Sequence, residues 1–323
     1  MTSKRFLAVF AAGFSAVCAG LIALNMVLDP YGLFRSSRTR SLPVYGEERI
    51  AKYLYSMRYI PENFDGILLG SSVSDNLDPR QFHGYRIYNA SINGGNVEDL
   101  RPIAENVYGK SELKLTLVCI HRYLTLDHGN KTDLMTPRQY WGALGSPQLL
   151  AAYLSGLAIR RGVVHGEYDD MGTLRESADP DSAVGRRTID KAVGDIQRGQ
   201  ASVGNYSIDP VALAGLNRIL TTARHRSRRM LVFYPPIPAS VFAIRRAEFA
   251  RYRETVGSLL GPGDVVVDFN DPSHSGLRED LLNFQDAVHL SKSGAAAVMS
   301  ELSGTVAALD ARSSAVVARA GEN

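Results

Sequence analysis

The chain has 323 residues, of which 45% are hydrophobic and 21% are charged, and its net charge is +3. This composition allows a sizeable buried core and excludes a wholly disordered chain. The length fits two average domains, or one α/β domain with a large insertion. The densest basic cluster closes a predicted helix and is interpreted as its solvated end: Arg224, Arg226, Arg228 and Arg229. No aromatic platform or known motif accompanies this cluster, so nucleic acid is not expected as a partner.

An uncharged apolar segment runs from Phe6 to Leu28 near the N-terminus. A helix of this length can cross a bilayer about 30 Å thick at about 1.5 Å per residue. We therefore expect residues 1–28 to be a membrane anchor, with the lipid bilayer as a partner through residues 6–28. The alternative is a signal peptide cleaved after Cys18. Cleavage there would leave an apolar stretch on the mature end, so the uncleaved anchor is favoured.

Three arginines, Arg35, Arg38 and Arg40, follow the apolar segment closely, so the basic residues do not fix its orientation. A single N-terminal anchor before a large C-terminal domain most often exports that domain. We therefore expect the domain outside the cytoplasm, which would be the periplasm if the cell is Gram-negative. The only cysteines, Cys18 and Cys119, fall in the apolar segment and in a predicted buried strand, so no disulfide framework is expected.

Residues 29–65 are expected to form a juxtamembrane connector with irregular and short helical pieces. Beyond it, short apolar runs alternate with longer amphipathic stretches, which predicts βαβ units, a mainly parallel sheet and helices on both faces. The predicted strands are 66–69, 86–89, 113–120, 230–234 and 265–269. The predicted helices are 97–108, 210–226, 240–260 and 291–309. The result is a three-layer α/β domain over residues 66–309, with 310–323 as a C-terminal tail.

A long insertion, residues 121–209, separates the third and fourth predicted strands. Within it, Ser146 to Arg161 has the pattern of an amphipathic helix. Gly162 to Gly204 is polar and rich in Asp, Gly, Ser and Arg, which predicts a loop. Insertions at strand ends often form lids and substrate sites in α/β enzymes. A disordered surface loop with no function of its own explains this composition equally well.

Two short motifs carry candidate chemistry. The first predicted strand runs into Gly70-Ser71-Ser72, which would put Ser72 at the carboxyl edge of the sheet, where ligands bind in open α/β folds. The second motif, Asp286-Ala287-Val288-His289, precedes the last helix. A serine hydroxyl becomes a nucleophile when a histidine takes its proton and a carboxylate orients that histidine. Asp286 and His289 could supply both groups from one loop. Each motif alone is common and nonspecific.

The order of these blocks resembles the SGNH/GDSL hydrolase superfamily: Gly70-Ser71-Ser72, then the segment 87–96 with Gly94, then Asp286-x-x-His289 before a small-residue helix. The resemblance covers residues 66 to 309. It implies a flavodoxin-like sandwich with five parallel strands in the order 2-1-3-4-5. It also implies Ser72 as nucleophile, His289 as base, Asp286 as its orienting carboxylate, and backbone N–H groups of Ser72 and Gly94 as the oxyanion hole. No cofactor or metal is implied.

Two departures from the family pattern matter. The usual Gly-Asp-Ser is Gly70-Ser71-Ser72, in which the middle residue does not carry the attack. The asparagine that normally follows the third strand is absent, because this chain has His121 and Arg122 there. That asparagine would donate to the oxyanion, and losing one such donor typically costs about 10²–10³ in rate. Candidate substitutes are Asn93, Asn96, His121 and Arg122, among which the sequence does not choose.

An N-terminal anchor with an altered third block is similar to membrane-anchored members of this superfamily that act on exported polysaccharides. That resemblance implies a serine esterase or O-acyltransferase acting on acyl, especially acetyl, esters of an exported or cell-envelope glycan, with a membrane-bound acyltransferase as a candidate partner. The alternative is a degenerate domain that binds glycan or scaffolds an acyl-transfer complex. The missing asparagine favours this alternative, and the intact Ser72, Asp286 and His289 favour catalysis.

Overall fold

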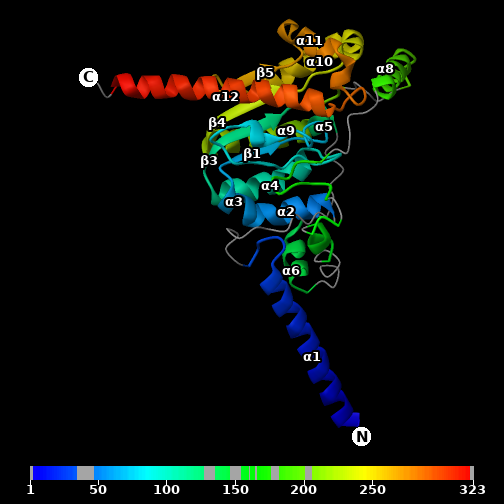
Figure 1. Cartoon of the computed structure of the whole chain (residues 1–323), viewed down its shortest axis with the longest axis vertical. Helices are drawn as coiled ribbons and strands as arrows, with labels where there is room; N and C mark the ends of the chain where they lie inside the picture. The colour runs from blue at the N-terminus through cyan, green and yellow to red at the C-terminus, as the bar shows by residue number, and fades with distance from the viewer. Residues whose placement is uncertain are drawn as a thin grey trace.

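A computed structural model describes residues 3–34, 47–126, 135–145, 154–159, 161–163, 166–175, 182–200 and 206–320. Its centre is a parallel five-stranded sheet in the order β2-β1-β3-β4-β5. The strands are β1 (Gly66–Leu69), β2 (Ile87–Asn89), β3 (Leu113–Cys119), β4 (Ser227–Tyr234) and β5 (Val265–Asp268). Helices cover the sheet, and the three-layer α/β/α fold with this strand order is confirmed (Figure 1).

Four helices connect or follow these strands near the predicted bounds: α4 (Val97–Lys110), α9 (Pro210–Arg226), α10 (Ala239–Gly257) and α12 (Lys292–Ala320). The start of α4 is fixed by a capping box between Asn96 and Asp99. The start of α9 is fixed by Asp209, whose carboxylate accepts two backbone N–H groups ahead of Pro210. The last helix, α12, continues past the predicted end at residue 309, and its C-terminal part extends beyond the sheet (Figure 1).

The basic cluster closes α9, as predicted, with Arg224 and Arg226 in the last turn of the helix. Three of its four residues are partly exposed and also have partners in the protein. Arg224 forms an ion pair with Asp264 at 2.6 Å, Arg226 donates to the Tyr108 carbonyl at 2.7 Å, and Arg229 lies 3.0 Å from Asp310. The reason is that β4 begins directly at Ser227, which brings these side chains to the helix–strand junction, where acceptors are within reach.

The N-terminal helix α1 (Ser3–Leu28) stands away from the α/β body (Figure 1). Its most apolar window has a mean hydropathy of 2.3, and none of that window is buried in the protein. It is therefore long and apolar enough to cross a bilayer, a property that an uncleaved anchor and a signal sequence share.

Helices α2 (Glu48–Met57) and α3 (Tyr59–Asn63) lie in the segment expected as a connector. Both pack against α4, and α2 buries its central residues, among them Lys52 and Tyr55. This segment therefore contributes to the packed body as well as joining it to α1.

The insertion after β3 contributes α5 (Tyr123–Leu126), α6 (Pro137–Gly145) and α8 (Ser182–Gln197). Residues 154–159 are helical, as expected, and residues 146–153 lie outside the described part. The expectation of a loop through 162–204 was wrong over α8. That helix places Gly185, Ile189 and Ile196 on one face and packs on α10 and on the short helix η3 (Leu281–Asn283). Its many polar residues masked this apolar face in the sequence.

Candidate active site at the sheet edge

Ser72 lies just beyond the end of β1 and is only 8% exposed. The turn before it needs a glycine, because a Cβ at Gly70 would lie 2.0 Å from the Ser74 Oγ and 3.0 Å from the Cys119 Cβ. Ser74 Oγ also lies 3.1 Å from the Ser71 carbonyl and 2.8 Å from the Ser91 Oγ. Packing and hydrogen bonds therefore hold Ser72 in a fixed position at the carboxyl edge of the sheet.

His289 joins Ser72 to Asp286 through a chain of hydrogen bonds. Its Nε2 lies 3.0 Å from the Ser72 Oγ, and its Nδ1 lies 2.9 Å from an Asp286 carboxylate oxygen. Both distances are within reach for proton transfer. The structure thus brings together the nucleophile, base and carboxylate expected from the sequence, although 217 positions separate Ser72 from His289.

The Asp286 carboxylate is held in its ionised form. Burial raises the pKa of this carboxyl, but hydrogen bonds from the His289 ring and from the backbone N–H groups of His289 and Val288 outweigh burial and lower it overall. The two backbone N–H groups each lie 2.7 Å from the same carboxylate oxygen. An ionised Asp286 can fix the ring tautomer of His289 and stabilise the imidazolium form.

The loop that carries Asp286 and His289 is closed at its base. Backbone hydrogen bonds join Gln285 N to the His289 carbonyl at 2.9 Å and Ser291 N to the Asn283 carbonyl at 2.9 Å. From the serine side, the Asn76 amide donates to the Leu290 carbonyl at 2.9 Å. Asn76 therefore ties the Ser72 loop to the loop of Asp286 and His289, a role that sequence analysis missed because nothing local marks it.

The loop with the expected oxyanion glycine runs beside Ser72, since Ser71 and Ile92 form a parallel bridge. Gly94 has a φ of +62°, which a residue without a side chain adopts readily. The side-chain oxygen of Asn96 accepts from the Glu98 and Asp99 N–H groups, so Asn96 is committed to capping α4. Asn93 engages its neighbours through backbone groups.

Charged side chains of helix α2 form hydrogen bonds to the backbone of this loop, a contact that the sequence did not suggest. The Glu48 carboxylate accepts from the Asn93 N–H at 3.1 Å and pairs with the Lys52 ammonium at 2.8 Å. Lys52 is fully buried, donates to the Ser91 carbonyl and lies 4.7 Å from the Tyr168 ring centroid. The Arg49 guanidinium donates to the Asn93 carbonyl at 3.0 Å. These contacts restrain the backbone on both sides of Ile92.

At the end of β3, His121 and Arg122 occupy the position of the missing asparagine. His121 is buried, with only 8% of the residue exposed, and among the residues that the structure describes none is a hydrogen-bond partner of its Nδ1. Burial, followed by the nearby charges of Arg122 and His289, lowers the pKa of His121 well below its ordinary value. Arg122 instead donates to the Tyr123 hydroxyl at 2.8 Å and stacks on that ring at 4.2 Å. His121 is thus the better placed of the two for a ligand.

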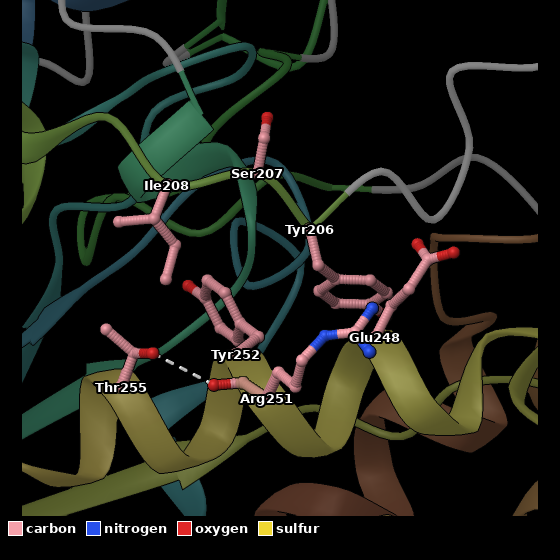
Figure 2. Close-up of a pocket in the computed structure, with 7 residues that line it drawn as sticks. All are labelled: Tyr206, Ser207, Ile208, Glu248, Arg251, Tyr252 and Thr255. Carbon is pink, nitrogen blue, oxygen red and sulfur yellow. Dashed lines mark hydrogen bonds between the residues drawn. The ribbon is translucent and has the colours of Figure 1, made fainter.

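Two pockets adjoin one another at Tyr206. A narrow one lies against the loop between Asp286 and His289 and is lined by His121, Arg122, Tyr206, Pro235, Pro236, Ile237, Val241, Ala287 and Val288. A wider one of about 380 Å³ is lined by Tyr206, Ser207, Ile208, Glu248, Arg251, Tyr252 and Thr255. Figure 2 shows the Tyr206 ring over the side chains that α10 presents to the wider pocket. The Tyr252 hydroxyl, in the wider pocket, donates to the carbonyl of His121, which lines the narrow pocket, at 3.2 Å. This hydrogen bond joins the walls of the two pockets.

No protein-family model and no curated protein matches this chain. Among solved structures, it is similar to one described as a "putative platelet activating factor from Streptococcus pneumonia". The TM-score is 0.38 and the sequence identity is 11%, over 77% of this chain and 86% of that chain. Similarity at this level does not carry a function from one protein to the other. The functional interpretation therefore depends on the geometry of the site.

Proposed function

We propose that this chain is a membrane-anchored serine esterase or O-acyltransferase of the SGNH type. The observation that carries this proposal is the hydrogen-bonded chain from Ser72 through His289 to Asp286. Such a chain at the carboxyl edge of a parallel sheet has the parts that covalent acyl transfer requires.

In the first step, the Ser72 Oγ bonds to the acyl carbon while its proton passes to the His289 Nε2. The resulting tetrahedral intermediate expels the alcohol, which takes that proton from His289 and leaves an acyl-Ser72 ester. In the second step, His289 takes a proton from water or from a sugar hydroxyl, whose oxygen attacks the acyl carbon. Collapse returns the proton to Ser72 and releases a carboxylic acid or a new ester.

The oxyanion formed in each step needs positioned donors. Backbone N–H groups of Ser72 and Gly94 are the first two in this proposal. We assign the third to the ring of His121, because its Nδ1 is buried with no hydrogen-bond partner in the described part of the chain and its lowered pKa favours the neutral ring, which carries one N–H. Asn96 is a poorer candidate, since its side chain caps α4.

The two pockets suggest how the substrate lies. The narrow pocket beside Val288 has a volume of about 10 Å³, roughly the room for one water-sized group, which suits the methyl of an acetyl group. The wider pocket has an aromatic wall and several polar groups, which suits the hydroxyl-rich alcohol portion of a glycan ester. We therefore propose an acetylated exported or cell-envelope glycan as substrate.

The anchor, its topology and the domain division are also proposed. Residues 1–28 would remain as an uncleaved span, 29–65 would join it to the body, and 66–309, with the insertion 121–209, would carry the reaction outside the cytoplasm. The length and hydropathy of α1 support the span. A membrane-bound acyltransferase that supplies acyl groups is a candidate partner.

Trapping the acyl-enzyme tests the proposed function. The purified full chain, incubated briefly with p-nitrophenyl acetate and quenched in acid, should gain one acetyl group on the peptide containing Ser72, as measured by mass spectrometry. Adding an oligosaccharide should then separate the two activities: a transferase acetylates the sugar, whereas an esterase releases acetate at an unchanged rate. Absence of acetylation, together with retained binding to oligosaccharide, would instead favour the glycan-binding or scaffold alternative, to which the missing asparagine points.

The contacts from α2 predict a positioning role for Lys52. Lys52→Met removes the donor to the Ser91 carbonyl and the partner of Glu48, so the oxyanion loop should lose its restraint. We expect kcat for p-nitrophenyl acetate to fall about 10- to 100-fold with little change in KM, because small misplacements of catalytic groups cost rates of this size.

The matched control for Lys52 is Arg58→Met, which removes an equivalent i,i+4 ion pair with Glu62 at a more exposed position. That variant should keep the wild-type kcat. Thermal melting of both variants would separate lost positioning from lost folding. If Lys52→Met melts earlier yet retains kcat below its melting transition, Lys52 serves stability alone.

A further inference from the structure

The end of α1 is fixed to the body through α6. The Asn25 amide, one turn before the helix ends, donates to the Leu144 carbonyl at 2.8 Å. After the helix, the Asp29 carboxylate accepts from the N–H groups of Leu33 and Phe34 at 2.7 and 3.0 Å. The Phe34 ring then packs edge-on against Tyr140 of α6, with centroids 5.8 Å apart. These contacts leave little freedom between α1 and α6.

The point at which α6 packs along α1 determines the depth of α6 relative to the bilayer. Apolar side chains of α1 remain exposed up to its last turn, including Met26, Val27 and Leu28. If these side chains lie in hydrocarbon, the boundary of the bilayer falls at this turn. The element packed against the same turn then lies at the level of the lipid headgroups, beside α1 (Figure 1).

One of the side chains that α6 exposes is aromatic. Trp141 is 68% exposed, although its neighbour Tyr140 is partly buried against the core. Tryptophan is enriched at membrane–water interfaces, because its ring is apolar and its indole N–H is polar. An exposed tryptophan beside the end of a membrane-spanning helix therefore matches the chemistry of this layer.

We propose that α6 is a membrane-docking element and that Trp141 inserts into the interfacial layer of the bilayer. The proposed occupant is lipid because α6, which carries Trp141, packs against α1, whose apolar side chains are exposed up to its last turn. Together the span and Trp141 give the domain two attachments, which fix its tilt and the height of the catalytic edge above the membrane. This inference rests on the proposed membrane span.

The chain contains a single tryptophan, so its fluorescence reports on this site alone. The full chain would be reconstituted into phosphatidylcholine/phosphatidylglycerol vesicles containing lipids with a nitroxide either near the headgroup or deep in the acyl chain. We expect Trp141 emission to be quenched several-fold more by the shallow nitroxide than by the deep one, and to be protected from aqueous iodide. Strong quenching by iodide without quenching by either nitroxide would overturn the proposal. Protection from iodide and from both nitroxides would also overturn it, because it would indicate that a protein partner or a second copy covers Trp141.

A relocated tryptophan is the matched control. In the Trp141→Phe background, Ile244→Trp places the reporter on α10, far from α1 along the long axis of the molecule (Figure 1). This reporter should respond to iodide and to neither nitroxide. Vesicle flotation distinguishes the two proposals: loss of flotation refutes the membrane span, whereas flotation with a water-exposed Trp141 refutes only the docking.

Discussion

Ser72→Ala should abolish covalent labelling by a fluorophosphonate probe, the largest effect that we expect from any single substitution. The probe bonds to an activated serine oxygen with loss of fluoride, and the substitution removes that oxygen. His289→Ala should slow labelling by about 10⁴-fold or more, since the group 3.0 Å from the Ser72 Oγ would no longer take its proton. Asp286→Asn should cost about 10⁴-fold, because an amide cannot stabilise the imidazolium form. Labelling rates would be followed by in-gel fluorescence or mass spectrometry.

Neighbouring serines provide the control for this prediction. The Ser71 Oγ is buried and has no hydrogen-bond partner among the described residues, so Ser71→Ala removes a hydroxyl from the same turn and leaves His289 in place. The fluorophosphonate probe should label the Ser71→Ala variant at nearly the wild-type rate. Labelling that survives Ser72→Ala would identify another nucleophile, with Ser71 and Ser74 the first to test. An unlabelled wild-type chain, under conditions in which a known SGNH esterase reacts, would support the scaffold alternative.

The sheet could be predicted from the sequence because buried parallel strands are continuous apolar runs with clear ends. The bounds of β1 match the prediction, since Gly66 and Gly70 flank three apolar residues. The start of β4 was missed by three residues. Ser227 and the two arginines after it are not apolar, yet they pair along β3, beginning with Ser227 opposite Leu113. Pairing with a neighbouring strand thus extends β4 where hydrophobicity gives no signal.

The candidate catalytic residues could be recognised in the sequence only as an ordered set of motifs. Their contact depends on a sheet that brings the ends of β1 and of the last loop together, which no local pattern contains. The restraint from α2 was missed for a related reason. Glu48 and Lys52 have the spacing of an ordinary surface ion pair, and only the fold reveals that Lys52 is buried against Ser91.

The same reasoning explains why the sequence could not choose the third oxyanion donor. Asn93, Asn96, His121 and Arg122 all carry donors, and the choice depends on which side chain is already engaged. Asn96 caps a helix and Arg122 contacts Tyr123. His121 lines a pocket, and its Nδ1 is buried with no hydrogen-bond partner in the part of the chain that the structure describes.

His121→Ala should therefore lower kcat for p-nitrophenyl acetate by about 10²–10³, the usual cost of one oxyanion donor. His121→Asn supplies an amide at the position where SGNH enzymes carry asparagine, and it should retain most of the activity that alanine loses. Arg122→Met should have a smaller effect than His121→Ala, because Arg122 is committed to Tyr123. Steady-state kinetics and the rate of acetyl-Ser72 formation would measure these effects together.

The pH dependence separates a neutral donor from a cationic one. Because burial lowers the pKa of His121 well below 6.5, the ring should stay neutral as the pH falls from 8 to its ordinary pKa. The ratio of wild-type to His121→Asn rates should then be constant between about pH 6.5 and 8, since asparagine does not titrate. A ratio that rises as the pH falls through this range would mean that a protonated His121 stabilises the oxyanion. Equal rates for wild type, His121→Ala and His121→Asn would remove His121 from the oxyanion hole altogether.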